Sequence, residues 1–185
     1  MQEKRNITKE HFDRRFEPAS DLQIAEAERH FGYEFPKDFK AFLKKNNGCR
    51  IQMELANIYE LVSGEGDVSE YHLDEIFGIC DMDDLDLLTM HAEPSWLLPV
   101  AGVGGGLHFS LDLRPSNLGK IYFYSADWPP NPQVLFDPIE FNEGEFRENS
   151  DVDGFIDDYI RPYWHAADSY TELLKIYGIS DDLMP

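Results

Sequence analysis

The sequence predicts a single α+β domain with an N-terminal helix pair, a central antiparallel sheet and C-terminal helices packed on that sheet. Three observations predict it: apolar residues at helical spacing come first, short strand-like segments come next, and helical spacing returns near the end of the chain. The chain has 185 residues, 42% of them hydrophobic, which is enough for one folded core. We expect residues 1–19 to be an N-terminal extension and residues 20–185 to be the domain.

Local signals define both expected N-terminal helices. Ser20 and Gln23 have the spacing of a capping box, and Gly32 fits a left-handed position after the first helix. Pro36 fits the first position of the second helix, and Gly48 fits its stop. The sequence therefore predicts two short helices in succession.

The pattern of residues in the middle of the chain predicts strands. Residues 50–61 and 71–81 are candidate strands separated by a polar loop, residues 62–70, and residues 81–93 fit a short helix. Further strands are expected at 96–101, 107–113, 119–126 and 134–141. Within 107–113, apolar residues alternate with His108, Ser110 and Asp112, so these should point away from the Phe109 face, with His108 exposed or half-exposed. Helices at 150–164 and 169–178 are expected to close the domain.

The charge of the chain is strongly negative and unevenly distributed. The formal net charge is −20, which argues against general nucleic-acid binding and against docking on anionic lipid. Between Arg50 and Arg114 there are 13 acidic residues and no Lys or Arg. Such a segment is either an ordinary solvated surface or a face shaped for a cationic protein.

The compartment expected from the sequence is the cytoplasm. Cys49 and Cys80 form no C-x-x-C pair, and neither a signal peptide nor a membrane-spanning segment is evident. The two cysteines give no disulfide framework, which favours a reducing environment.

The glycines of "AGVGGGLHF" raise the question of a phosphate-binding loop. The Walker pattern fails because no lysine follows the loop until Lys120, and the Rossmann pattern fails because Leu107 and Phe109 stand where glycine is needed. The segment after the loop alternates like a strand instead of starting a helix. We expect Gly102, Gly104, Gly105 and Gly106 to form a turn between two strands.

No other motif predicts catalysis or metal binding. Residues 149–160 resemble a calcium loop, but Ile160 stands where the bidentate Glu is required. The six histidines are scattered without an H-E-x-x-H motif, and there is no G-x-S-x-G elbow. We therefore expect no catalytic residue, no metal site and no cofactor.

The segment "DLQIAEAERHFGYEFPKDFKAFLKKNNGC" resembles the start of SUKH-superfamily domains, which are named in part for the fungal Smi/Knr cell-wall-assembly regulators. The downstream order, "LLPVAGVGGGLHFSLDL", "GKIYFY" and then "FIDDYI", is also similar, so the resemblance extends from about Ser20 to Ile160. It implies an α+β domain used for protein binding. The motif positions carry over as fold-defining residues: Ile24, Glu28, Pro36, Phe39, Leu43 and Gly48.

The resemblance implies an immunity protein, since bacterial members look mostly like proteins that neutralise toxins, often nucleases, of polymorphic or contact-dependent toxin systems. A nuclease cleft is basic, so a basic toxin is the expected partner and an acidic surface would favour its binding. The candidate partner-binding residues are Glu65, Asp67, Glu70, Asp81, Asp83, Asp84 and Asp86. Two alternatives remain: a regulatory scaffold of the Smi/Knr type, and a small-ligand-binding protein or enzyme that uses the Gly102–His108 loop.

Overall fold

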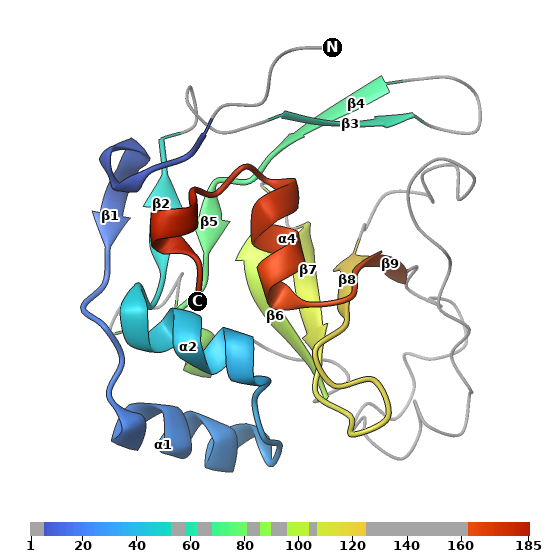
Figure 1. Cartoon of the computed structure of the whole chain (residues 1–185). Coiled ribbons are helices and arrows are strands. Elements are labelled where there is room, and N and C mark those ends of the chain that lie inside the picture. Colours follow the sequence, from blue (N-terminus) through green and yellow to red (C-terminus); the bar gives the residue numbers. More distant parts are fainter. Residues whose placement is uncertain are drawn as a thin grey trace.

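In the part of the chain that the structure describes, the fold is a seven-stranded antiparallel sheet with helices on one face (Figure 1). The computed structural model describes residues 6–52, 58–62, 68–80, 86–89, 96–103, 107–124 and 163–185. Within these residues the strand order of the sheet is β1-β2-β5-β6-β7-β8-β9, and β3 and β4 form a separate hairpin. The α+β class and the antiparallel sheet predicted from the sequence are confirmed.

The elements have the following bounds. The strands are β1 (Phe12–Arg15), β2 (Cys49–Ile51), β3 (Ile58–Val62), β4 (Val68–His72), β5 (Glu75–Ile76), β6 (Leu97–Gly102), β7 (His108–Asp112), β8 (Ile121–Tyr124) and β9 (Tyr163–Ala167). The helices are α1 (Asp21–Phe31), α2 (Lys37–Lys45) and α4 (Tyr170–Ile176).

The helix pair forms where the local signals predict it, with two corrections at α2. At α1, the amide of Gln23 donates to Ser20 Oγ and the amide of Ser20 donates to Gln23 Oε1, which is the capping box. Gly32 is left-handed, with φ 77°. Pro36, however, is the extended residue before α2 instead of its first residue. The left-handed residue after α2 is Asn47, with φ 63°, and not Gly48.

Several predicted strand and helix bounds were wrong. The single strand expected at 50–61 contains β2 and β3, and the one at 71–81 contains the end of β4 and all of β5. In the short helix expected at 81–93, the described residues form only a 3₁₀ turn, Leu87–Thr89. Tyr163 and Trp164, predicted as the end of a helix, belong to β9, where Trp164 pairs with Phe123 of β8. The rest of that helix and the strand expected at 134–141 lie outside the described residues.

Aromatic side chains join the helices to the sheet in the main core. The Tyr170 ring of α4 contacts the rings of Phe39 and Phe42 of α2, with centroids 4.9 and 5.2 Å apart. Phe109 of β7 contacts Tyr177, just after α4, at 5.3 Å. Burial of such large rings is the main source of stability in a core of this kind.

Both faces of β7 are covered. Phe109 and Leu111 are buried toward the helices, but Ser110 and Asp112 are also fully buried. Asp112 accepts hydrogen bonds from the Arg114 guanidinium, which itself lies 3.7 Å above the ring of Trp96. The alternation in the sequence therefore correctly placed Ser110 and Asp112 on the face opposite Phe109. That face is buried at Ser110 and Asp112 instead of being exposed to solvent.

The described part of the expected N-terminal extension is built into the domain. β1 pairs with β2 at the edge of the sheet. Ile7 is buried, its amide donates to Gly178 O at 2.7 Å, and its carbonyl oxygen accepts from the Ser180 amide at 2.8 Å. Residues 6–19 thus complete the same core as the rest of the chain.

Candidate functional site

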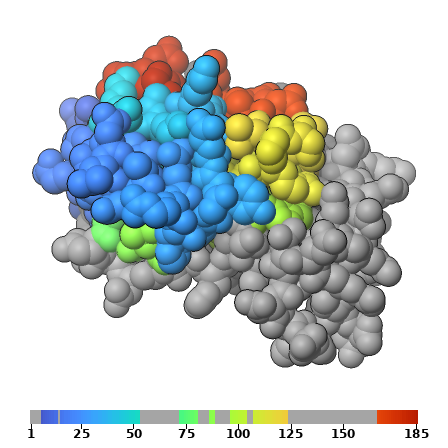
Figure 2. All heavy atoms as spheres, turned by 90° about the horizontal axis from the view of Figure 1, so that it is seen from below, coloured from blue at the N-terminus to red at the C-terminus, as the bar shows by residue number. Residues whose placement is uncertain are grey.

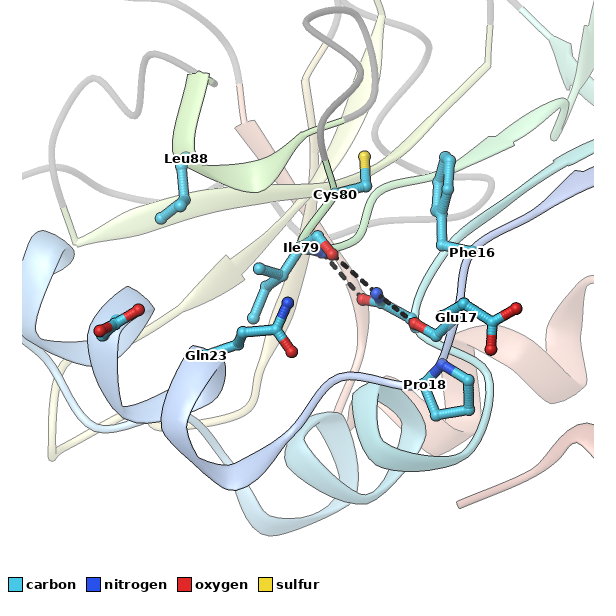
Figure 3. Close-up of a pocket in the computed structure, with 9 residues that line it drawn as sticks. Phe16, Glu17, Pro18, Gln23, Ile79, Cys80 and Leu88 are labelled. Atoms are coloured by element: carbon cyan, nitrogen blue, oxygen red, sulfur yellow. Dashed lines mark hydrogen bonds between the residues drawn. The ribbon is translucent and has the colours of Figure 1, made fainter.

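A pocket of about 500 Å³ lies where the segment before α1, α1 itself and the segment after β5 meet. Figure 3 shows Pro18 and Gln23 on one side of it and Ile79, Cys80 and Leu88 on the other. In the space-filling view from below, green residues that follow β4 in the sequence lie at the surface next to the blue α1 (Figure 2). The pocket is of the size that commonly holds a ligand or a side chain of a partner.

Asn47 lines the pocket and joins its two sides. Its side-chain amide donates to the carbonyl oxygens of Glu17, at 2.8 Å, and Ile79, at 2.7 Å. Its Oδ1 atom accepts from the amide of Ile79 at 2.8 Å. Asn47 is buried and left-handed, a backbone conformation that asparagine tolerates better than most residues. One side chain therefore sets the distance between the segment before α1 and the segment after β5.

Gly48 and Gly78 let the backbone after α2 and the backbone after β5 approach closely. A Cβ on Gly48 would lie 2.7 Å from Ile76 O and 2.8 Å from Gly78 N. A Cβ on Gly78 would lie 2.7 Å from both Asn47 Oδ1 and Gly48 N. The role of Gly48 is thus close approach to β5, and not the helix stop that the sequence suggested.

The walls of the pocket are mainly apolar and its rim is acidic. Ile79 is buried in the wall, whereas Phe16, Cys80 and Leu88 are half-buried. The exposed rim residues are Glu17, Pro18, Gln23 and Glu26. None of the described residues that line the pocket is Lys or Arg.

The two cysteines differ in their expected reactivity, which provides a probe of this pocket. Cys49 is buried, and burial raises the pKa of its thiol, so the reactive thiolate is scarce at neutral pH. Cys80 is half-buried in the pocket wall, and neither cysteine is disulfide-bonded. We expect N-ethylmaleimide to modify Cys80 in the native protein and Cys49 only on unfolding, which mass spectrometry of peptides from native and urea-treated protein measures. Equal modification of both in the native state would contradict this assignment.

The two candidate acidic residues that the structure describes, Glu70 and Asp86, lie at different places in the fold. Glu70 lies in β4 of the hairpin at the top of Figure 1, whereas Asp86 lies next to the 3₁₀ turn that contacts α1, near the bottom. Five of the candidates, Glu65, Asp67, Asp81, Asp83 and Asp84, lie outside the described residues. A role of these acids in binding stays a prediction.

Asp86 needs a correction, because it is buried. Its Oδ1 atom accepts hydrogen bonds from the amides of Cys80, at 3.3 Å, and Leu88, at 3.2 Å. The residue therefore closes the loop that carries two wall residues of the pocket. We retain Asp81, Asp83 and Asp84 as partner-binding candidates and assign Asp86 to the structure of this loop.

The residues expected to define the fold lie in and around the helix pair. Ile24, Phe39 and Leu43 are buried in the core. Glu28 Oε1 accepts hydrogen bonds from the amide of Phe35, at 2.8 Å, and from Lys40 Nζ, at 3.0 Å. Glu28 thus holds the turn between α1 and α2 from the end of α1.

The glycine-rich segment lies between the antiparallel strands β6 and β7, as predicted, but Gly102, which was expected in the turn, is the last residue of β6. Gly102 pairs with His108 across this hairpin, and His108 is half-exposed. Gly104, Gly105 and Gly106 lie outside the described residues. The segment leads into a strand, so it lacks the helix N-terminus on which phosphate-binding loops depend. Within the described part of the chain, no group of three or more His, Cys, Asp or Glu residues could hold a metal ion.

The sequence profile of the SMI1/KNR4 family, also called SUKH-1, matches residues 18–158. The match covers most of the chain and begins just before the helix pair. The chain belongs to the SMI1/KNR4 family. Domains of this family are generally non-enzymatic. No curated protein and no solved structure matches the chain significantly. None of the helices in the described residues of this family member is long and apolar enough to cross a membrane.

Sequence reasoning missed the pocket of this SMI1/KNR4 domain. Glu17 and Pro18 fell in the expected extension, and Ile79 and Cys80 fell in an expected strand. The one local signal was "NNG", because an asparagine directly after a helix often adopts the left-handed conformation. That signal locates Asn47 but does not say which distant segments its side chain joins.

Proposed function

We propose that this chain is a cytoplasmic immunity protein that binds and neutralises a basic, nuclease-type toxin of a polymorphic or contact-dependent toxin system. Its action is stoichiometric binding, without a catalytic residue. The observation that carries the proposal is membership of the SMI1/KNR4 family together with a net charge of −20.

The distribution of charge supports a basic partner. Residues 51–113 contain 13 acidic residues and no Lys or Arg, so this part of the chain is strongly negative even though Asp86 and Asp112 are buried. A toxin that cleaves nucleic acid must present cationic groups to phosphates. An inhibitor that covers such a cleft gains association rate and selectivity from an acidic surface.

The test uses the protein encoded by the neighbouring gene. We expect that protein to be toxic when expressed alone, and the present chain to abolish toxicity and form a 1:1 complex with it. Replacing Asp81, Asp83 and Asp84 with asparagine should lower the association rate constant about tenfold at low salt, and this difference should shrink as salt rises. Stopped-flow kinetics at several salt concentrations measures both effects.

A control variant separates a local acidic surface from net charge. Glu10→Gln, Asp13→Asn and Asp181→Asn together remove the same charge from exposed positions elsewhere. We expect this triple variant to retain nearly the full association rate. Equal rates for both triple variants would reject the acidic segment as the binding face. Absence of any toxic neighbour, together with a stable complex with a host regulatory protein, would favour the scaffold role instead.

A further inference from the structure

We propose that the pocket lined by Asn47, Ile79 and Cys80 receives one apolar side chain of a basic partner protein, and that Glu17 and Glu26 at its rim pair with Lys or Arg residues flanking that side chain. This proposal rests on the proposed function, because the expectation of a basic partner comes from there. It adds a docking point to the acidic residues Asp81, Asp83 and Asp84 that the proposed function tests.

The interior of the pocket suits an apolar group. Phe16, Ile79 and Leu88 supply apolar walls, and removing an inserted side chain from water against them is favourable. Both N–H groups of the Asn47 side chain already donate to backbone carbonyls. Asn47 therefore offers no spare side-chain N–H group to an anion or a carbonyl group.

The surroundings of the pocket suit cations. Its described lining contains two exposed carboxylates, those of Glu17 and Glu26, and no Lys or Arg. An anionic ligand would be repelled, whereas basic groups at the rim would be attracted.

An exposed leucine extends the apolar surface beside the rim. Leu22 is 67% exposed, and it precedes Glu26 by four residues in α1, so the two share one face of the helix. An apolar centre with a charged border is the usual organisation of a protein–protein interface. This combination favours a protein partner over a free small molecule.

Four short peptides separate the two parts of the proposal. They are acetyl-Lys-Leu-Lys-amide, acetyl-Lys-Gly-Lys-amide, acetyl-Glu-Leu-Glu-amide and acetyl-Glu-Gly-Glu-amide. Binding is monitored by the NMR shifts of the Ile79, Cys80 and Leu88 amides and by protection of Cys80 from N-ethylmaleimide. We expect the Lys-Leu-Lys peptide to bind about tenfold more tightly than the Lys-Gly-Lys peptide, because only the former fills the pocket. It should also bind more tightly than the Glu-Leu-Glu peptide.

Two matched variants test the rim. Glu17→Gln with Glu26→Gln should weaken binding of the Lys-Leu-Lys peptide about threefold, as expected for two exposed ion pairs. Glu10→Gln with Asp13→Asn removes the same charge from exposed positions that do not line the pocket, and should leave this binding nearly unchanged. Modification of Cys80 with N-benzylmaleimide should fill the pocket and abolish binding.

The outcomes distinguish this proposal from the proposed function. Equal binding of the Lys-Leu-Lys and Lys-Gly-Lys peptides, or no shift at Ile79, Cys80 and Leu88 with any peptide, would overturn the pocket proposal. If the neighbouring toxin binds the benzyl-modified protein as tightly as the unmodified one, the immunity role stands and the pocket proposal fails. If the Lys-Leu-Lys peptide binds as expected but no toxin does, the pocket proposal stands and the immunity role fails.

Discussion

Replacing Gly48 with alanine is expected to lower the free energy of unfolding by about 3 kcal/mol. The added Cβ would lie 2.7 Å from Ile76 O and 2.8 Å from Gly78 N. These are backbone atoms, which cannot rotate away as a flexible side chain could. The chain must therefore separate α2 from β5 or strain both. Urea denaturation monitored by tryptophan fluorescence measures the loss.

Gly32→Ala is the control for this variant, because its cost has a different origin. Gly32 has φ 77°, but no heavy atom lies within 4 Å of an added Cβ. We expect a loss of about 1 kcal/mol, from backbone strain alone. Gly48 lacks a positive φ, so its larger loss would be purely steric. Similar losses for the two variants would contradict the close approach inferred at Gly48.

Asn47→Ala is expected to lower the free energy of unfolding by about 4 kcal/mol. The substitution removes three hydrogen bonds, so that the carbonyl oxygens of Glu17 and Ile79 and the amide of Ile79 lose their partner. It also places alanine at φ 63°, which disfavours residues with a Cβ. Both effects act on the folded state, and chemical denaturation measures their sum.

Asn47→Gly separates these two contributions. Glycine adopts a positive φ freely but makes none of the three hydrogen bonds. We expect this variant to be about 1 kcal/mol more stable than Asn47→Ala and still well below the natural protein. If Asn47→Gly unfolded at the same urea concentration as the natural protein, the side-chain hydrogen bonds would contribute nothing measurable to stability.

The sequence predicted best those features that short-range chemistry determines. The capping box of Ser20 and the left-handed Gly32 are local features, and both were correctly located. The hairpin of β6 and β7 was also predicted, because its strands are adjacent in the sequence. The same reasoning placed the stop of α2 at Gly48, whereas the left-handed residue is Asn47, one position earlier.

Long-range pairing explains why the rest of the fold could not be predicted. β1 has the sequence "FDRR", which has no strand-like apolar pattern, and it is a strand because β2 offers an open edge. β9 similarly forms against β8, which is distant in the sequence. The pocket depends on Asn47 joining Glu17 and Ile79, which are 30 and 32 residues away from it. No periodic pattern of apolar residues in the sequence indicates that these three residues lie together in the fold.

The attachment of the C-terminal residues to α2 bears on how the domain is made. Asn46 Nδ2 donates to Leu183 O at 2.6 Å, across a separation of 137 residues, and Lys45 Nζ donates to Met184 O at 2.6 Å. At a synthesis rate of 5–20 residues per second, the end of α2 leaves the ribosome roughly 7–27 s before these partners exist. During that interval the apolar face of α2 lacks Tyr170 of α4, which contacts Phe39 and Phe42 in the folded domain. The apolar face of α2 therefore stays exposed in the nascent chain until residues 170–184 have been translated.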